Sequence, residues 1–225
     1  MKQLGRILIC APFILVATLA QGQIKRVGSG YLFRQKYTAG TQIKYITVVS
    51  QGMGGKTGIS MTMPFLQRIT AVSKNVASIT VTVGPASLNG KPMGKTSSFE
   101  MRVNSQGLVV GGPQGAAQGV TAFPLKPIKV GQTWTAVVPA PGMGNQASTA
   151  TATYKFLKMG SVKGKPVAVV AVSLSSQGGF ALSGSGVSYL SGEDGSLIYN
   201  SMQLKAASPM SQGEPITINV LVKRG

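Results

Sequence analysis

Histidine is absent from the sequence, and cysteine occurs once, at Cys10. Without histidine the chain lacks the side chain best suited to moving protons near neutral pH, and the usual base of a serine or cysteine nucleophile. Cys10 lies in an apolar N-terminal run. Removal of that run would leave a chain without thiolate nucleophiles, zinc–thiolate sites, iron–sulfur ligation or disulfides.

Acidic residues are scarce as well: Asp and Glu total 4, against 22 Lys and Arg. They are Glu100, Glu193, Asp194 and Glu214. A glycosidase needs two carboxylates that face each other, and a calcium ion takes about six to eight oxygen ligands. Glu193 and Asp194 are neighbours in an expected hairpin loop, where we expect turn-forming residues with solvent-facing side chains. We therefore predict no catalytic, metal-binding or cofactor-binding residues and no enzyme activity.

Two weaker chemical patterns remain. A serine nucleophile beside a lysine of lowered pKa is the one catalytic arrangement that the composition leaves open. Residues 95–98 and 205–208 bring Lys and Ser together, but in no recognisable motif, so a Ser–Lys hydrolase is kept only as the enzyme alternative. The Gly55-Lys56-Thr57 tripeptide is similar to the end of a phosphate-binding loop, but Ser50 stands where that loop needs glycine, and a strand-like segment follows.

The N-terminus has the pattern of an export signal. Two basic residues precede a largely apolar run of 14 residues (7–20), and the small residues Thr18 and Ala20 favour cleavage after Ala20. Cleavage after Gly22 fits the same rule. The run is shorter than the roughly 20 residues of a membrane-spanning helix and contains Pro12, although a retained anchor stays open. The expected location is periplasmic or extracellular.

The rest of the chain alternates apolar and polar residues with period two, which is typical of strands that bury one face. Ile43, Tyr45, Thr47 and Val49 would share one such face. The same alternation recurs in residues 59–65, 79–83, 98–103 and 216–222. These patterns predict antiparallel strands with one wetted side.

Turn residues separate these segments. Residues 104–107 and 192–195 each end in glycine, where a positive φ carries no Cβ penalty, so each predicts a hairpin loop. Residues 163–166 (Lys-Gly-Lys-Pro) predict a third turn, and a hairpin turn is expected between Val49 and Ile59.

The two halves of the chain are similar to each other. Gly40 and Gly131 stand at an offset of 91 residues, and so do Phe65 and Phe156. We interpret this as a duplication, with chance similarity of two β-rich segments as the alternative. The expected organisation is a signal peptide (1–20), a first β repeat (21–110), a linker (111–126) and a second β repeat (127–225). The predicted fold is all-β, with antiparallel sheets from two related halves that form a half-barrel or a sandwich behind an N-terminal signal helix.

The run Lys129-Val130-Gly131-Gln132-Thr133-Trp134 follows a proline-rich approach at 123–127, and Glu193-Asp194-Gly195 closes a late hairpin. In these features the chain resembles a diffuse group of exported bacterial β-rich proteins of unknown activity. The resemblance implies export and a β fold. It brings no known activity and no catalytic residues.

Net charge is the strongest remaining signal. At a formal +18 the chain will be attracted to anionic lipids, acidic polysaccharides or nucleic acid. Its lysines are spread along the sequence without interleaved aromatics, so we predict no specific nucleic-acid binding. Lysine can also simply confer solubility and protect sheet edges.

A concave apolar sheet face could instead hold a lipid. Six methionines would make such a face adaptable: Met53, Met61, Met63, Met93, Met101 and Met143. The resulting hypothesis is an exported, non-catalytic protein that binds an apolar ligand or an anionic envelope surface. The alternative is a structural or adhesive matrix protein held by positive charge.

Overall fold

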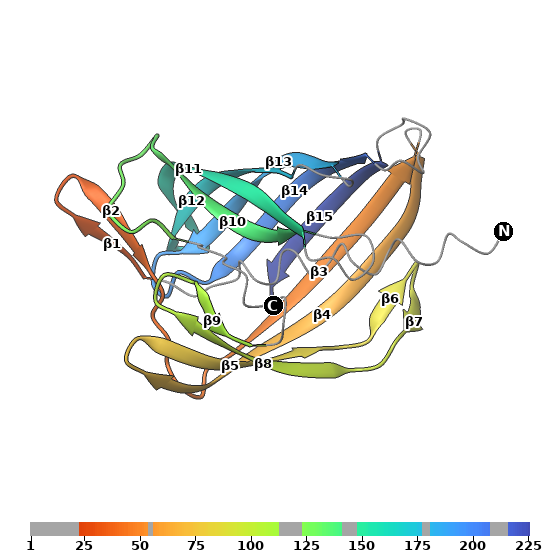
Figure 1. The fold of residues 1–225 in the computed structure, drawn as a ribbon, viewed down its shortest axis with the longest axis horizontal. Helices are drawn as coiled ribbons and strands as arrows, with labels where there is room; N and C mark the ends of the chain where they lie inside the picture. Colours follow the sequence, from red (N-terminus) through yellow and green to blue (C-terminus); the bar gives the residue numbers. More distant parts are fainter. Residues whose placement is uncertain (1–22, 54–55, 113–122, 141–147, 177–180, 208–215) are drawn as a thin grey trace.

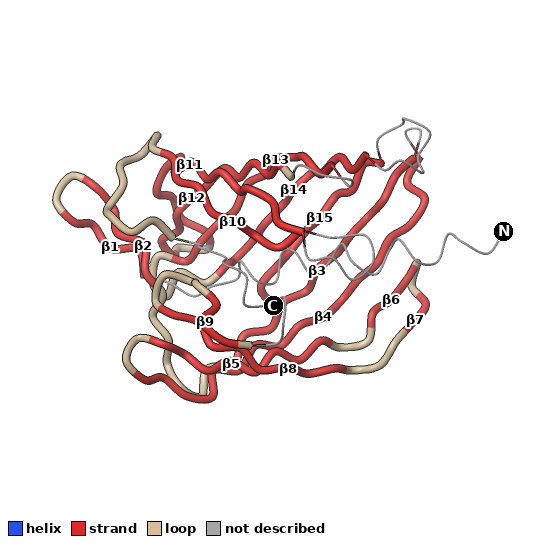
Figure 2. Tube along the Cα trace, viewed as in Figure 1, coloured by secondary structure: helices blue, strands red, loops and turns tan. Residues whose placement is uncertain are grey.

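The structure is a computed structural model, and it describes residues 23–53, 56–112, 123–140, 148–176, 181–207 and 216–225. The expected signal peptide and Glu214 lie outside these ranges. Within them no helix is long and apolar enough to cross a membrane. Figure 2 shows strands joined by loops throughout this part of the chain.

The strands follow one another along the whole described chain. Their bounds are β1 Gln23–Val27, β2 Gly30–Arg34, β3 Gln42–Met53, β4 Lys56–Ser73, β5 Val76–Val83, β6 Ala86–Leu88, β7 Lys91–Met93, β8 Ser97–Asn104, β9 Val109–Gly111, β10 Thr133–Ala140, β11 Ser148–Val162, β12 Lys165–Ser175, β13 Ala181–Ser191, β14 Leu197–Ala207 and β15 Ile216–Arg224.

Thirteen of these strands form one antiparallel sheet, in the order β10-β11-β12-β13-β14-β15-β3-β4-β5-β8-β9, with β6 and β7 attached beside β4. The sheet curves strongly around its own inner face, and β1 and β2 form a separate hairpin at one end (Figure 1). In the described part of the chain β10 and β9 do not pair with each other, so the sheet stays open. The prediction of an all-β antiparallel fold is confirmed, and the half-barrel is the form that it takes.

Strands of the two halves meet in the middle of the sheet. β15 pairs with β3, and Val220 lies opposite Val49, 171 residues away along the chain. On either side of this seam the strands follow one another as a meander. The division into two duplicated repeats stays a prediction, but a single continuous sheet runs through both of them.

The inner face of the sheet holds the core. Ile43, Tyr45, Thr47 and Val49 are all buried, as their alternation predicts. The same holds for the inward residues of the neighbouring strands, among them Met61, Met63, Phe65, Ile79, Val81, Val83, Met101 and Val103.

The expectation for the methionines was wrong at one position. Met93 lies on the short strand β7, and 42% of its surface is exposed, because β7 pairs only with β6 beside the main sheet. The side chains of Met53 and Met143 lie outside the described part.

One end of the half-barrel is closed by the β1–β2 hairpin, which the sequence patterns did not predict. Phe33 of β2 is fully buried, and its ring lies against those of Phe123, Trp134 and Phe156. Backbone hydrogen bonds join Tyr31 to Ile128 at N···O distances of 2.7 and 2.9 Å. The hairpin therefore ties the start of the second half to the rest of the molecule.

The predicted turns are present. Lys163 and Gly164 have φ values of 50° and 78° and connect β11 directly to β12. Positive φ at two successive residues matches the twist of the flanking strands, which explains why glycine occupies the second position. Pairing of β3 with β4 confirms the hairpin expected between Val49 and Ile59, although residues 54–55 at its tip lie outside the described ranges.

Candidate binding surface

The loop between β13 and β14 holds Asp194 in a hydrogen-bond network. The backbone N–H and the hydroxyl of Ser196 donate to Asp194 Oδ1 at 2.9 and 2.7 Å. Arg224 Nη1 donates to Asp194 Oδ2 at 3.2 Å. Asp194 is thus a turn former as predicted, but its side chain points into the loop and toward β15 instead of into solvent.

The charge state of Asp194 follows from these contacts. Burial alone would raise the pKa of its carboxyl group. The hydrogen bonds from Ser196 and Ser191 and the positive charge of Arg224 outweigh that effect, so the pKa lies below its usual value. The carboxylate is therefore a permanent anion near neutral pH, in which state it stabilises the loop.

The other described carboxylates are exposed. Glu193 pairs with Lys165 at 3.5 Å, and both side chains are more than half exposed. Glu100 lies on the outward side of β8 and is exposed. The structure brings none of the three together as a facing pair, and no cluster of metal-ligating residues occurs within the described ranges.

The Ser–Lys arrangement gains no geometric support. Lys95 and Lys205 are both exposed, and Ser208 lies outside the described ranges. A lysine that serves as the base for a serine nucleophile needs a desolvated ammonium group, because desolvation lowers the pKa of that group. Every lysine whose side chain is described is exposed to solvent.

The positive charge of the molecule is largely unneutralised. In the described part of the chain only two ion pairs form, Lys165–Glu193 and Arg224–Asp194. The other Lys and Arg residues whose side chains the structure describes form no further ion pair, and all of them except the half-buried Arg34 are exposed.

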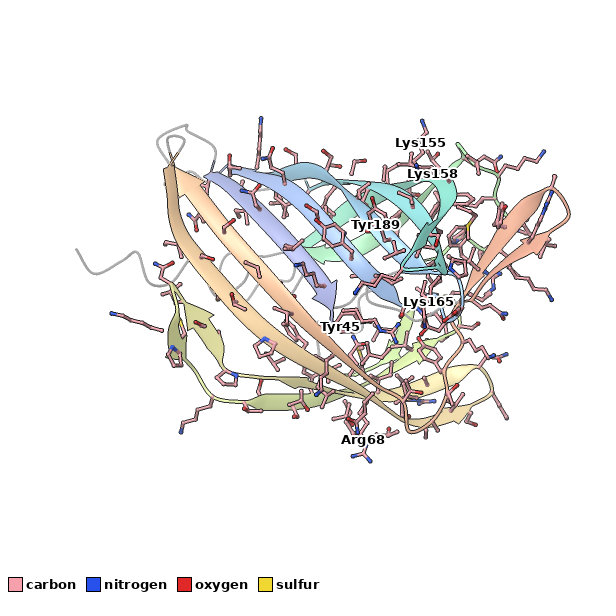
Figure 3. All side chains as sticks on the ribbon, turned by 180° about the vertical axis from the view of Figure 1, so that it is seen from behind. Tyr45, Arg68, Lys155, Lys158, Lys165 and Tyr189 are labelled. Atoms are coloured by element: carbon pink, nitrogen blue, oxygen red, sulfur yellow. The ribbon has the colours of Figure 1, made fainter. Side chains whose placement is uncertain are left out.

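A β-bulge in β11 brings two lysines to the same face. The pairing with β12 skips Leu157, so that Lys155 lies opposite Ala171 and Lys158 lies opposite Val169. Residues three apart in a regular strand point to opposite faces, whereas the extra residue of a bulge restores the same face. Both lysines therefore project from the outer face of the sheet (Figure 3).

Two adjacent rows of cross-strand neighbours extend from these lysines over the outer face. We call them together the apolar–basic band. The first row, in successive pairing from β11 to β3, is Lys158, Val169, Tyr189, Tyr199, Lys223 and Ile46. The second is Lys155, Ala171, Val187, Ser201, Leu221 and Val48.

The next two rows along the same strands have a different character. One is Thr153, Ser173, Ser185, Gln203, Asn219 and Ser50, and the other is Thr151, Ser175, Ser183, Lys205, Thr217 and Gly52. The outer face thus changes from apolar side chains flanked by lysines to a surface of hydroxyl and amide groups. Period-two alternation identifies the outward residues but not which of them lie side by side, so the band was not predicted.

The inner face contains a few buried polar atoms. Tyr45 OH, Thr47 Oγ1, Gln67 Nε2 and Asn200 Oδ1 have no hydrogen-bond partner among the described residues. Asn200 does donate through Nδ2 to Ser188 Oγ at 2.7 Å. Burial raises the pKa of Tyr45, so its hydroxyl group stays protonated. These residues lie within the core, where the side chains around them are covered.

The fold and this surface together define an open, antiparallel all-β half-barrel with a strongly basic exterior. No protein-family model and no curated protein matches the sequence.

Two solved structures are similar. One is the "putative exported protein with YmcC-like fold" of Bacteroides fragilis NCTC 9343, with 11% identity, coverage of 86% of this chain and 99% of that one, and a TM-score of 0.35. The other is a "putative lipoprotein" of Parabacteroides distasonis ATCC 8503, with 9% identity, coverage of 85% and 99%, and a TM-score of 0.37. Both scores are below 0.5, and we base the function on the residues of this chain.

Proposed function

We propose that this is an exported, non-catalytic protein of the periplasm or extracellular space that binds an anionic surface of the cell envelope through its positive charge. The observation that carries the proposal is the imbalance between exposed basic side chains and carboxylates. Only Lys165 and Arg224 are paired with acidic groups in the described part of the chain. Unpaired surface charge of one sign attracts and concentrates partners of the opposite sign.

The test is binding of the mature protein to anionic and neutral partners of the same kind. We would measure sedimentation with phosphatidylglycerol-containing vesicles and with dextran sulfate, using phosphatidylcholine vesicles and plain dextran as controls. We expect binding to an anionic partner at low ionic strength and its loss at about 1 M salt, where the Debye length is about 3 Å. Absence of binding to both anionic partners, or binding that survives molar salt, would contradict the proposal.

Export is supported by the basic residues, apolar run and small residues of the N-terminal segment. We expect the protein recovered from a bacterial envelope fraction to have the mass of a chain that begins at Gln21. Intact-mass spectrometry checks this. A full-length mass in the cytoplasmic fraction would contradict export, and a full-length mass in the membrane fraction would indicate a retained anchor.

The non-catalytic part of the proposal is supported by the engagement of Asp194 in loop structure and by the exposure of the lysines. The Ser–Lys alternative predicts an activated serine. We expect a fluorophosphonate probe to leave the mass of the folded protein unchanged. Stoichiometric labelling of one serine, together with a turnover that its replacement abolishes, would establish the hydrolase instead.

An apolar ligand on the inner face has less support. Val49, Met61 and Leu182 line different strands of that face, and their exposed fractions are 6%, 7% and 1%. An acyl chain could contact side chains covered to this extent only by displacing what already covers them. We therefore assign binding to the outer face.

A further inference from the structure

We infer that the apolar–basic band docks on an anionic phospholipid bilayer. The inference rests on the proposed function, because it names the anionic surface and the side chains that contact it. The centre of the band is the pair Tyr189 and Tyr199, on β13 and β14. Their ring centroids lie 5.7 Å apart at an interplanar angle of 78°.

The composition of the band matches a membrane interface. Tyrosine has an apolar ring and a polar hydroxyl group, and it is favoured where one end of a side chain is dry and the other is wet. Around the tyrosines lie Val187, Leu221 and Val48, all half-buried, and Ile46, which is 46% exposed. Lysines stand at both sides of the tyrosine pair, Lys158 on β11 and Lys223 on β15.

The curvature of the sheet sets the depths at which the tyrosine rings and the lysine ammonium groups would meet the bilayer. The outer face of the sheet is convex (Figure 1), so strands in the middle of the band approach a flat surface most closely. Lys158 and Lys223 lie four strands apart, or about 19 Å along the sheet. When Tyr189 and Tyr199 reach the acyl boundary, these lysines lie higher, at the level of the phosphate groups. Long lysine side chains also adjust their height to keep the ammonium group among the headgroups.

No carboxylate opposes this docking in the described part of the band. Glu100 lies on β8, which is three strands beyond β3 and so outside the band. Glu193 and Asp194 lie in the β13–β14 loop, where Lys165 and Arg224 bind them. Figure 3 shows Lys165 nearer the β1–β2 hairpin, apart from Lys155 and Lys158. The band therefore presents positive charge to a partner without local neutralisation.

A bilayer explains the band better than a soluble anionic polymer does. A polymer would gain from the lysines alone, and its binding would be indifferent to the apolar residues between them. The apolar side chains of the band that are still accessible, which excludes Val169 at 6% exposure, gain free energy only from a partner that removes them from water. The hydroxyl-rich rows farther along the same strands offer no such surface, which confines the contact to one end of the outer face.

The experiment compares charge-matched variants on vesicles of phosphatidylcholine and phosphatidylglycerol, mixed at about three to one. Each lysine near such an anionic surface contributes about a fivefold change in binding. The test variant is Lys155→Gln/Lys158→Gln. Its control is Lys91→Gln/Lys95→Gln, which removes the same charge from exposed positions outside the band. We expect the partition coefficient to fall at least about tenfold for the first and less than about twofold for the second.

A second pair of variants tests the apolar contribution. Val187→Ser removes a half-buried residue in the middle of the band, on β13, and Val76→Ser removes a half-buried valine of β5, outside the band. We expect Val187→Ser to weaken vesicle binding about threefold and to leave dextran sulfate binding unchanged, and Val76→Ser to change neither. Circular dichroism and thermal unfolding would confirm that all four variants fold.

The outcomes distinguish a failure of bilayer docking through the band from a failure of the proposed attraction to anionic surfaces. Equal losses for both lysine pairs, together with no effect of Val187→Ser, would overturn docking through the band while leaving attraction to anionic surfaces intact. Binding to dextran sulfate but not to the vesicles would overturn the bilayer as partner. Failure to bind either would remove the proposed function as well.

Discussion

The ring of Phe33 meets the ring of Phe156 edge-on, with centroids 5.2 Å apart and an interplanar angle of 85°. Phe33 belongs to the separate β1–β2 hairpin, whereas Phe156 lies on β11 of the main sheet. Both side chains are fully buried. The hairpin therefore joins the core at this contact. Edge-to-face aromatic pairs add to the free energy gained by burying the two rings.

Replacing Phe33 with alanine should therefore loosen the end of the half-barrel. We expect Phe33→Ala to lower the free energy of unfolding by about 3 to 5 kcal/mol, from lost burial and the cavity left between the rings. Urea unfolding followed by tryptophan fluorescence measures this, since Trp134 also contacts Phe33. The control is Leu125→Ala, where 71% of the side chain is exposed and a change below about 0.5 kcal/mol is expected. Equal effects of the two substitutions would contradict the role given to the hairpin.

Gly186 makes room for its neighbours on the inner face. It lies between Val172 and Met202 on the adjacent strands. A Cβ at this position would collide with the carbonyl oxygen of Ser201 and lie 2.6 Å from Met202 Cγ. Because the carbonyl belongs to the backbone, the strands would have to move apart.

We expect Gly186→Ala to destabilise the protein by about 2 kcal/mol or more. Gly160→Ala serves as the matched control, because a Cβ there would meet only the side chains of Val167 and Val169, at 3.8 and 3.9 Å, which are ordinary contacts. Its expected effect lies within about 0.5 kcal/mol of zero. Thermal unfolding of the two variants checks the difference, and a Gly186→Ala variant as stable as the control would show that the two strands can separate at little cost.

Asp194 should make stability depend on pH. Its pKa is lowered in the folded protein, so its contribution is present above the unfolded value of about 3.9 and is lost as the pH falls through the folded value. Asp194→Ala is expected to cost about 1 to 2 kcal/mol near neutral pH, because Ser196, itself fully buried, loses its acceptor.

The difference between wild type and Asp194→Ala should shrink below about pH 4, as measured by urea unfolding across that range. Glu193→Ala is the adjacent control, since its exposed pair with Lys165 should contribute less than about 0.5 kcal/mol. A pH-independent difference between wild type and Asp194→Ala would show that charge is not the source of its effect.

Thr47 offers a substitution that should stabilise the protein. Its side chain is 1% exposed, and its hydroxyl oxygen has no hydrogen-bond partner among the described residues. Valine has nearly the same shape without the cost of burying an unpaired hydroxyl group. We expect Thr47→Val to raise the free energy of unfolding by about 1 kcal/mol. Thr62→Val on the opposite face is the control for β propensity, and a destabilised Thr47→Val would reveal a partner for the hydroxyl group.

The strands were predictable because burial of one sheet face leaves a period-two signature. Ile43, Tyr45, Thr47 and Val49 carry it clearly, and all four are buried. The hairpin loops were predictable for a similar reason, since glycine marks positions of positive φ such as Gly107 and Gly195. In both cases the cause of the structure acts within a few residues of sequence.

The missed features depend on contacts between distant segments. The β1–β2 strands have five residues each and bury little besides Ile24 and Phe33, so their alternation is too short to recognise. Lys155 and Lys158 are three residues apart, and only the bulge at Leu157 places them on one face. The pairing of Tyr189 with Tyr199 follows from the hairpin, but their alignment with Lys158 and Lys223 requires the register of three more strands, β11, β12 and β15.

The seam between β15 and β3 also has a consequence for the order in which the molecule is completed. Val49 has its partner Met61 on β4, but its neighbour on the other side is missing until residues near Val220 have been synthesised. Contacts between such distant segments require closure of a long loop and form slowly. Until then β3 pairs only with β4 and is an edge strand of a partly assembled sheet, open to pairing with other chains. The centre of the finished sheet is therefore the last part to form, and crowding or delay before the two strands meet would promote aggregation there first.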